Sequence, residues 1–455
     1  MNFIVCKFGG TSVATSEKLQ QIVKILKLDS DRRCVVLSAP GKAPGCPVKV
    51  TDMLIALVNK AQMRRSCAAE IKDLKQRFHA IYDPLNVPPA RIDEVLTDLD
   101  KRCKSRREHP GKYRDLLVAA GEDINCMLFA EYLNAINIPA VYISPRDAGL
   151  VVTPVFGDAQ PLPESAKKLA ASLKKLCTEK VVVFPGFFGY TAEGDVATFS
   201  RGGSDLTGSI LAEALDAVEY ENWTDVDGIF SAHPSMVEKP MQIPALTYKE
   251  MRELSSIGFN VLHEEAVKPV LRKKIPIRLR NTSNLENKGT VIVSERLPTE
   301  SDVIGIASSG GYCSFTLQKF LMNREKGFGR RLLSIFETLD LSYEHCPSGV
   351  DSISVILDQA QLKPEMINTI IHKIEVELQP DEIGTEFGIA LVAVVGEGLI
   401  HKIGVLAQAA KALAKAEVNI KMANQGSSEI SMIFGIDADD EKKAVNALYD
   451  EFFRK

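Results

Sequence analysis

Residues 3–12 read FIVCKFGGTS, and this stretch decides the fold of the amino-terminal part of the chain. Its apolar start predicts a buried strand, Lys7 stands at the end of that strand, and Gly9 and Gly10 follow. Glycines leave backbone amides open to an anion, and a helix after them directs N–H groups to the same point. The stretch therefore predicts a phosphate site, although a plain turn with a solvated lysine is the alternative.

The composition is that of an ordinary globular protein. The chain has 455 residues, of which 45% are hydrophobic and 25% charged, with a formal net charge of -4, so we expect two to four domains and neither nucleic acid nor a membrane as partner. Its 9 cysteines lack metal-site spacing, which favours reduced thiols in a cytoplasmic protein. No apolar run reaches the length of about 18 residues that a membrane span needs.

From residue 1 to about 295, continuous apolar strands alternate with helix-length amphipathic stretches. This pattern predicts an α/β domain with a mainly parallel sheet that helices cover on both faces. Beyond a linker near residues 295–302, the chain repeats itself with an offset of 77 residues, which relates Gly327 to Gly404 and Gly349 to Gly426. The repeat predicts two small βαββ-type modules, whose seam is a natural place for a ligand.

Further polar motifs stand at predicted strand and helix ends. Arg201 precedes a second glycine pair and offers a planar fork for a carboxylate or phosphate, while Ser204 and Asp205 open the next helix. Thr224 and Asp225 end a predicted strand, where nucleotides collect in open α/β sheets. Glu122 opens a further helix at Gly121-Glu122. The structural alternatives to a binding role are helix caps and turns for the earlier residues and a helix-dipole partner for Glu122. Neither a P-loop nor a Rossmann glycine motif is present.

As a set, these motifs resemble those of the aspartate kinases over essentially the whole chain. The segments that carry the resemblance are residues 7–12, 51–52, 121–122, 199–205, 223–229, 261–263 and 419–431. The resemblance implies a three-layer α/β/α sandwich of the amino acid kinase type in residues 1–295, followed in residues 296–455 by two ferredoxin-like βαββαβ ACT domains. One ACT domain would comprise about 312–383, and the other about 300–311 plus 384–455.

The resemblance also implies an activity. Members of the family transfer the γ-phosphoryl group of ATP to the side-chain carboxylate of L-aspartate, with Mg²⁺, at the entry to lysine, threonine and methionine biosynthesis. The catalytic residues implied are Lys7 and Asp205. The aspartate-binding residues implied are Thr51, Glu122, Arg201 and Ser204, with Arg201 on the α-carboxylate and Glu122 on the α-ammonium. The nucleotide-binding residues implied are Lys7, Gly9, Gly10, Thr224, Asp225, Phe230, Asn260 and Val261. No metal ligand is assigned within the protein.

The same resemblance implies regulation by an end-product amino acid, lysine or threonine, and a homodimer through the ACT domains that could extend to a tetramer. The effector positions that match are Met322, Gly327, Phe328, Ser342, Tyr343 and Glu344, and Glu344 stands where a shorter acid is expected. Fusion to a homoserine dehydrogenase is not expected.

Two departures concern the nucleotide side. Ser235 and Asn260 stand where relatives carry an arginine and a lysine, which leaves the ATP affinity open. The alternatives are therefore another amino acid kinase, acting on glutamate or acetylglutamate, and a catalytically weak amino acid sensor.

Overall fold

The computed structural model describes residues 2–105, 109–200, 202–259, 262, 266–296 and 302–454. These residues form two compact units. Unit 1 takes its residues from 1–229, 242–248 and 260–296, and unit 2 from 230–241, 249–259 and 297–455. None of the helices in the described part is long and apolar enough to cross a membrane.

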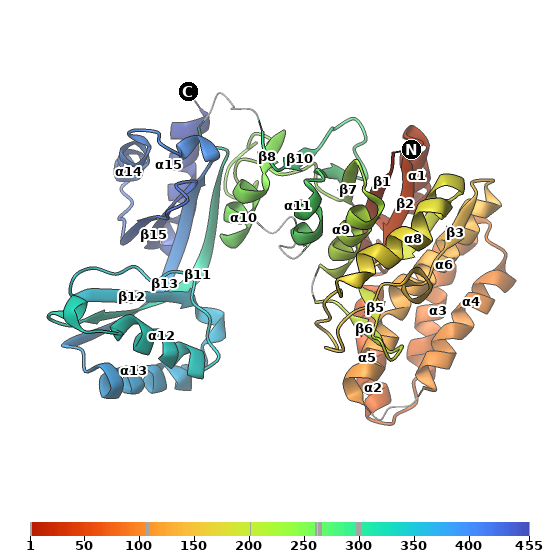
Figure 1. The fold of residues 1–455 in the computed structure, drawn as a ribbon, viewed down its shortest axis with the longest axis horizontal. Coiled ribbons are helices and arrows are strands. Elements are labelled where there is room, and N and C mark those ends of the chain that lie inside the picture. Colours follow the sequence, from red (N-terminus) through yellow and green to blue (C-terminus); the bar gives the residue numbers. More distant parts are fainter. Residues whose placement is uncertain are drawn as a thin grey trace. The chain divides into compact units, whose positions relative to one another are not determined.

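Unit 1 is an α/β layer structure, as the alternation of strands and helices predicts (Figure 1). Eight of the described strands form one sheet in the order β3-β4-β2-β1-β7-β9-β10-β8. All neighbours in it are parallel except β9 and β10. The strands of unit 1 are β1 (Ile4–Phe8), β2 (Arg32–Leu37), β3 (Ala140–Tyr142), β4 (Val181–Pro185), β5 (Phe188–Tyr190), β6 (Val196–Thr198), β7 (Glu219–Thr224), β8 (Ala245–Thr247), β9 (Ile277–Asn281) and β10 (Thr290–Val293).

Helices cover both faces of this sheet. The helices are α1 (Ser16–Leu28), α2 (Val50–Gln62), α3 (Ala68–Tyr82), α4 (Pro89–Cys103), α5 (Pro110–Val118), α6 (Ala120–Ala135), α7 (Pro145–Ala148), α8 (Glu164–Glu179), α9 (Gly203–Leu215) and α11 (Val267–Lys273). Cys6 and Phe8 of β1 lie in one apolar core with α1 and α6. Because side chains alternate along a strand, Lys7 points to the other face, where α9 packs.

The central strands are held by a buried polar network beneath the only tryptophan. Trp223 is fully buried, stacks on Phe8 with ring centroids 6.0 Å apart and lies 4.5 Å from the guanidinium of Arg280. Its indole N–H donates to Glu221 at 2.9 Å, and the same carboxylate accepts two hydrogen bonds of 2.8 Å from Arg32. Both oxygens of the Glu221 carboxylate accept hydrogen bonds, and this network fixes the end of β7 at which Thr224 and Asp225 emerge.

Unit 2 is built on one antiparallel sheet in the order β12-β11-β13-β15-β14. Its elements are α10 (Tyr248–Ser256, of which residues 249–256 belong to this unit), β11 (Gly305–Gln318), α12 (Phe328–Thr338), β12 (Ser352–Asp358), α13 (Pro364–Leu378), β13 (Glu382–Val395), α14 (Val405–Lys415), β14 (Met422–Gln425), β15 (Ser431–Asp437) and α15 (Glu441–Phe453). The helices α12 and α14 are related by the predicted offset of 77 residues, and each begins after a glycine with positive φ, Gly327 at 77° and Gly404 at 90°.

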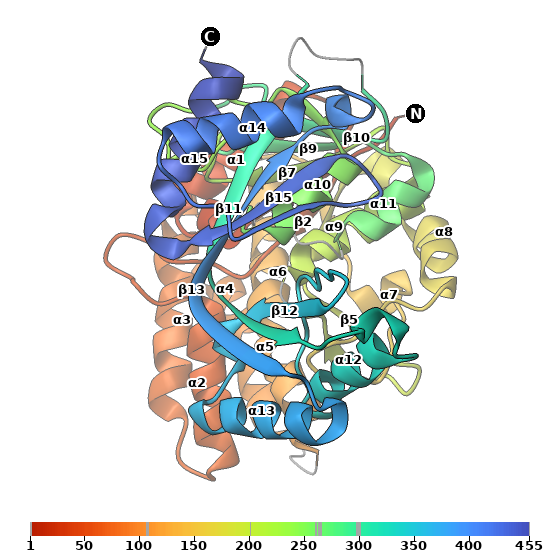
Figure 2. The same ribbon diagram turned by 90° about the vertical axis from the view of Figure 1, so that its left-hand side faces the viewer.

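Two apolar cores share that sheet. One lies under α12 and α13 and the other under α14 and α15, so the repeat corresponds to two βα modules. Strands β11 and β13 are long enough to run through both modules, which Figure 2 shows. The register between them shifts at Ser309/Tyr312, where Gly311 has a φ of 87°. This irregularity marks the passage from one module to the other.

Two segments of the sequence expected to belong to the kinase domain pack in unit 2 instead. In residues 230–241, the Met241 amide donates to the hydroxyl of Tyr449 at 2.9 Å. In residues 249–259, a carboxylate oxygen of Glu250 accepts a hydrogen bond of 2.9 Å from the amide of Glu397. Long-range pairing of this kind leaves no local signature, which is why the alternation of strands and helices does not reveal it.

Candidate active site

A pocket of about 480 Å³ in unit 1 brings most of the predicted catalytic and aspartate-binding residues together. It lies at the carboxyl ends of β1, β2 and β7 and at the start of α9, which is where ligands collect in open α/β sheets. The predicted residues that line it are Lys7, Gly9, Gly10, Thr51, Glu122, Ser204, Asp205, Thr224 and Asp225.

Lys7 is the buried cation of this pocket. It is 8% exposed, and its ammonium forms an ion pair with Asp205 and a 3.3 Å hydrogen bond with the side chain of Asn222. Asn222 also donates to Asp205 at 3.0 Å, so the three side chains form a closed triangle. Parallel pairing of β1 with β7 sets Lys7 directly beside Asn222. These contacts hold the Lys7 ammonium at the carboxyl end of β1, where a phosphate can bind it.

The glycine turn is shaped by a close backbone approach. A Cβ on Gly41 would lie 2.7 Å from the carbonyl carbon of Gly10, and the Gly41 amide donates to the Gly10 carbonyl at 2.8 Å. A short 3₁₀ helix, Gly10–Val13, follows, and Thr15 then caps α1 through the Lys18 amide. The helix predicted to follow this turn is α1, which begins at Ser16 with Thr15 as its N-cap.

Glu122 is the buried acid of the pocket. It lies in the first turn of α6 and is 4% exposed, and its Oε2 has no hydrogen-bond partner among the described residues. Burial raises the pKa of Glu122 to about 8, with a smaller contribution from the negative charge of neighbouring Asp123. A buried carboxylate with an unused oxygen in a ligand pocket is suited to bind a cationic group of the substrate.

The second glycine pair opens α9 as predicted. Gly202 has a φ of 75° and caps the helix, and Ser204 lies in the first turn, where its side chain would collide with any Cβ on Gly186. Thr51 lies in the first turn of α2, and Thr224 donates to Asp225 at 3.2 Å. Each of these side chains reaches the pocket from a different strand or helix end.

The remaining predicted positions are not placed in this pocket. Arg201, Asn260 and Val261 lie outside the described residues. Phe230 is half-buried and belongs to unit 2, and Ser235 of the same unit bonds His233 at 2.6 Å. The roles of Arg201, Phe230, Asn260 and Val261 stay predictions.

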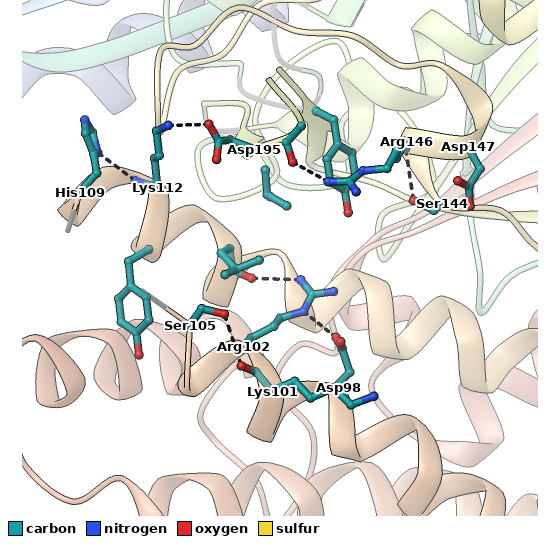
Figure 3. Close-up of a pocket in the computed structure, with 15 residues that line it drawn as sticks. Asp98, Lys101, Arg102, Ser105, His109, Lys112, Ser144, Arg146, Asp147 and Asp195 are labelled. Atoms are coloured by element: carbon teal, nitrogen blue, oxygen red, sulfur yellow. Dashed lines mark hydrogen bonds and ion pairs between the residues drawn. The ribbon is translucent and has the colours of Figure 1, made fainter. Parts of the chain in front are cut away.

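A larger cavity of about 850 Å³ lies elsewhere in unit 1 (Figure 3). Figure 3 shows Arg102 and Asp98 on one side of it and Lys112, Asp195 and Arg146 on the other. Arg102 is nearly buried, and its guanidinium pairs with Asp98 at 2.5 Å and also with Asp123. Asp123 lines neither cavity, but it follows Glu122 directly in the first turn of α6. This ion-pair network therefore supports the turn that carries Glu122.

The predicted effector residues lie in the first module of unit 2. Ser342 and Tyr343 line a cavity of about 860 Å³ together with residues of α12 and the segment after it. Gly327 caps α12, whereas Met322 and Phe328 are buried in the core of the module, and the Glu344 amide donates to the carbonyl of Ile356. The cavity is also lined by Arg330, Glu337 and Asp340.

Sequence reasoning missed several residues in or next to the candidate active site. Asn222 bonds both Lys7 and Asp205, Gly41 contacts the glycine turn, and Lys49 lines the pocket two residues before Thr51. The pairing of β1 with β7 could not be inferred from either strand alone. For Lys49, its closeness in sequence to Thr51 was the available signal.

Comparisons with known proteins identify the family of the chain. Residues 2–281 match the model of the amino acid kinase family, and residues 392–452 match an ACT domain model. The chain is 46% identical to Aspartokinase 3 of Bacillus subtilis over 99% of its own length and 98% of that protein.

Solved structures lead to the same group. The aspartate kinase of Clostridium acetobutylicum superposes with a TM-score of 0.87 at 36% identity, covering 99% of this chain and 100% of that one. Aspartokinase III of Escherichia coli, in complex with aspartate and ADP, superposes with a TM-score of 0.78 at 26% identity, covering 99% and 100%. The fold, the pocket and these similarities together show that the chain belongs to the aspartokinases of the amino acid kinase family.

Proposed function

We propose that this protein transfers the γ-phosphoryl group of ATP to the side-chain carboxylate of L-aspartate and forms 4-phospho-L-aspartate. The observation that carries the proposal is the single pocket in which the Lys7 ammonium, two glycine turns and the buried Glu122 meet. The experiment is a phosphoryl-acceptor screen with aspartate, glutamate and acetylglutamate, in which hydroxylamine traps the acyl phosphate. Aspartate alone should support turnover, and turnover with another acceptor would contradict the proposal.

The chemistry demands alignment and charge neutralisation rather than a general base. The aspartate carboxylate, with an ordinary pKa of about 3.9, is already ionised at neutral pH. Its approach to a triphosphate brings two anions together, so Lys7 and the amides around Gly9, Gly10 and Gly203 lower the barrier by neutralising the charge of the transferring group. Ser204 and Thr51 would orient the substrate, with Arg201 on its α-carboxylate.

The pocket also fits Mg²⁺ bound with the nucleotide. Asp205 and Asp225 offer the carboxylate oxygens that this ion prefers, and Mg²⁺ commonly binds through one or two carboxylates plus substrate phosphates. No group of three or more potential ligands gathers anywhere in the described residues. Bound with ATP, the ion would supply further positive charge to the phosphates, while Thr224 would position the nucleotide.

Aspartate affinity should depend on pH through Glu122. Because burial holds the pKa of Glu122 at about 8, the acid is mostly protonated at pH 7, and it must ionise to bind the substrate ammonium. We expect the KM for aspartate to fall as pH rises from 7 to 8.5. Binding at pH 7 should release about one proton, which calorimetry in buffers of different ionisation enthalpy measures.

Glu122→Gln is the matched variant for this prediction. It should raise the KM for aspartate and abolish proton release, because the amide keeps the shape of the side chain without a titrating group. A variant that still releases the proton would show that another group titrates.

We infer that an end-product amino acid inhibits the enzyme from the first module of unit 2. The E. coli aspartokinase III structure in complex with lysine and aspartate supports lysine as the first effector to test. Acidic residues Glu337 and Asp340 beside Ser342 and Tyr343 would suit a ligand with an extra ammonium group. Threonine, alone and paired with lysine, is the comparison, and sedimentation with and without effector tests the proposed homodimer through the ACT modules.

Tyr343→Ala should weaken this inhibition. Tyr343 is 47% exposed at the cavity, so its removal takes contact area from a ligand without opening the core. We expect the lysine concentration for half-inhibition to rise about tenfold, the equivalent of about 1.4 kcal/mol, in an inhibition assay. Val376→Ala, on the exposed side of α13, is the control and should leave inhibition unchanged. Equal sensitivity of the two variants would argue against this cavity.

A further inference from the structure

A second lysine lines the catalytic pocket, from an exposed loop. Residues 38–49 connect the end of β2 to α2, and within them the Ala43 and Cys46 backbones pair with each other at 3.0 and 2.9 Å. Gly45, at a φ of 76°, turns the chain back toward the pocket. Lys49 then caps α2 and accepts a hydrogen bond of 3.0 Å from the Met53 amide through its carbonyl. The backbone at Lys49 is therefore fixed, while its side chain extends from an exposed position.

The base of this loop lies against the phosphate turn. The Gly41 amide donates to the Gly10 carbonyl at 2.8 Å, and the Val50 amide donates to the Pro40 carbonyl at 2.9 Å. These bonds tie the start of α2, and Lys49 with it, to the turn that follows β1. Lys49 therefore lines the same pocket as Gly9, Gly10 and Thr51.

The positive charge of Lys49 has no anionic partner among the described residues of the pocket. Among the described residues that line the pocket, Lys7 and Lys49 are the basic ones. The Lys7 ammonium is paired with Asp205 and Asn222, whereas the Lys49 ammonium forms no hydrogen bond or ion pair with any residue that the structure describes. The reaction brings a carboxylate and a triphosphate together. Because the Lys49 ammonium has no anionic partner in the described part of the chain, its electrostatic attraction to these anions is not reduced by an existing ion pair.

We propose that Lys49 binds the γ-phosphoryl group of ATP during its transfer to aspartate. This inference rests on the proposed function. The Lys49 ammonium contacts an oxygen of the group that moves and therefore acts on ATP but not on ADP. The exposed position lets the side chain release the product after transfer. The bond that forms joins the aspartate carboxylate oxygen to phosphorus, the bond that breaks joins phosphorus to the β–γ bridging oxygen, and ADP leaves.

The test compares nucleotides with and without the γ-phosphoryl group. We expect Lys49→Met to lower the affinity for the non-hydrolysable analogue AMP-PNP with Mg²⁺ about tenfold in calorimetry and to leave ADP affinity within about twofold. Turnover should fall about 10²-fold, and Lys49→Arg should recover part of it. Lys42→Met is the matched control, because Lys42 is exposed on the same loop and does not line the pocket, and it should behave as wild type.

Other outcomes would overturn the proposal. Equal losses of AMP-PNP and ADP affinity would place Lys49 on the α- and β-phosphates, and a rise in the KM for aspartate alone would place it on the acceptor. Wild-type behaviour of Lys49→Met would make it a solvated surface lysine. The nucleotide-binding arms do not depend on turnover, so a wild-type protein that binds AMP-PNP but forms no acyl phosphate would refute the proposed function separately.

Discussion

Lys7→Ala is expected to lower kcat about 10³-fold or more. The Lys7 ammonium is the buried cation at the end of β1, where it pairs with Asp205 and donates to Asn222. Removing one preorganised group that stabilises a developing charge typically costs about 10²–10³ in rate, and the loss here also leaves Asp205 to repel the phosphates. Steady-state kinetics with saturating aspartate and ATP measures the effect.

The control for this variant must separate catalysis from folding. Asp205 is partly buried, so the loss of its partner could destabilise unit 1. Lys7→Met keeps most of the side-chain volume, and in both variants binding of the proposed effector lysine to unit 2 should match that of the wild type. Activity within about tenfold of wild type, in a protein that melts normally, would show that Lys7 is not the phosphate-binding cation.

Arg102→Met should cause the largest loss of stability. The Arg102 guanidinium pairs with Asp98 and Asp123, and it donates to the Leu116 carbonyl at 3.0 Å. Its removal leaves the Asp123 carboxylate, which is 3% exposed, without its cationic partner. Breaking a buried pair in this way costs about 3–5 kcal/mol of unfolding free energy, which urea denaturation measures.

The exposed Arg91 gives the matched comparison. It pairs with Glu94 and Glu131 while its side chain is 45% exposed, so Arg91→Met should cost less than about 1 kcal/mol. Adding Asp123→Asn to Arg102→Met should restore part of the lost stability, because the stranded charge is then gone. Equal costs for Arg102→Met and Arg91→Met would mean that the Arg102 network is not a supporting element of α6.

Much of this fold could be predicted from the sequence, because helix formation and glycine turns depend on residues that are close together in the chain. The burial of Leu19, Ile22, Val23 and Leu26 on α1 follows from helical spacing, and the 77-residue repeat gave two modules with helices at matching positions. Residues that the glycine turns marked, such as Lys7 and Ser204, line one pocket, whereas Thr51 was implied by the resemblance alone.

The parts that escaped prediction depend on contacts between distant segments. Asn222 reaches Lys7 only because β7 pairs with β1, and nothing within either strand specifies that neighbour. The placement of residues 230–241 and 249–259 in unit 2 likewise depends on partners such as Tyr449, far along the chain. Lys49 was missed because an exposed lysine in a polar loop has the same local pattern whether or not it faces a ligand.

The shared strands of unit 2 have a consequence for how regulation can evolve. Because β11 and β13 each begin in one module and finish in the other, the first module is nested inside the second rather than attached beside it. Deleting or exchanging one module would interrupt β11 and β13, which also form part of the other module. Any rearrangement of the shared strands in one module would therefore reach the other, and the two modules would be inherited together.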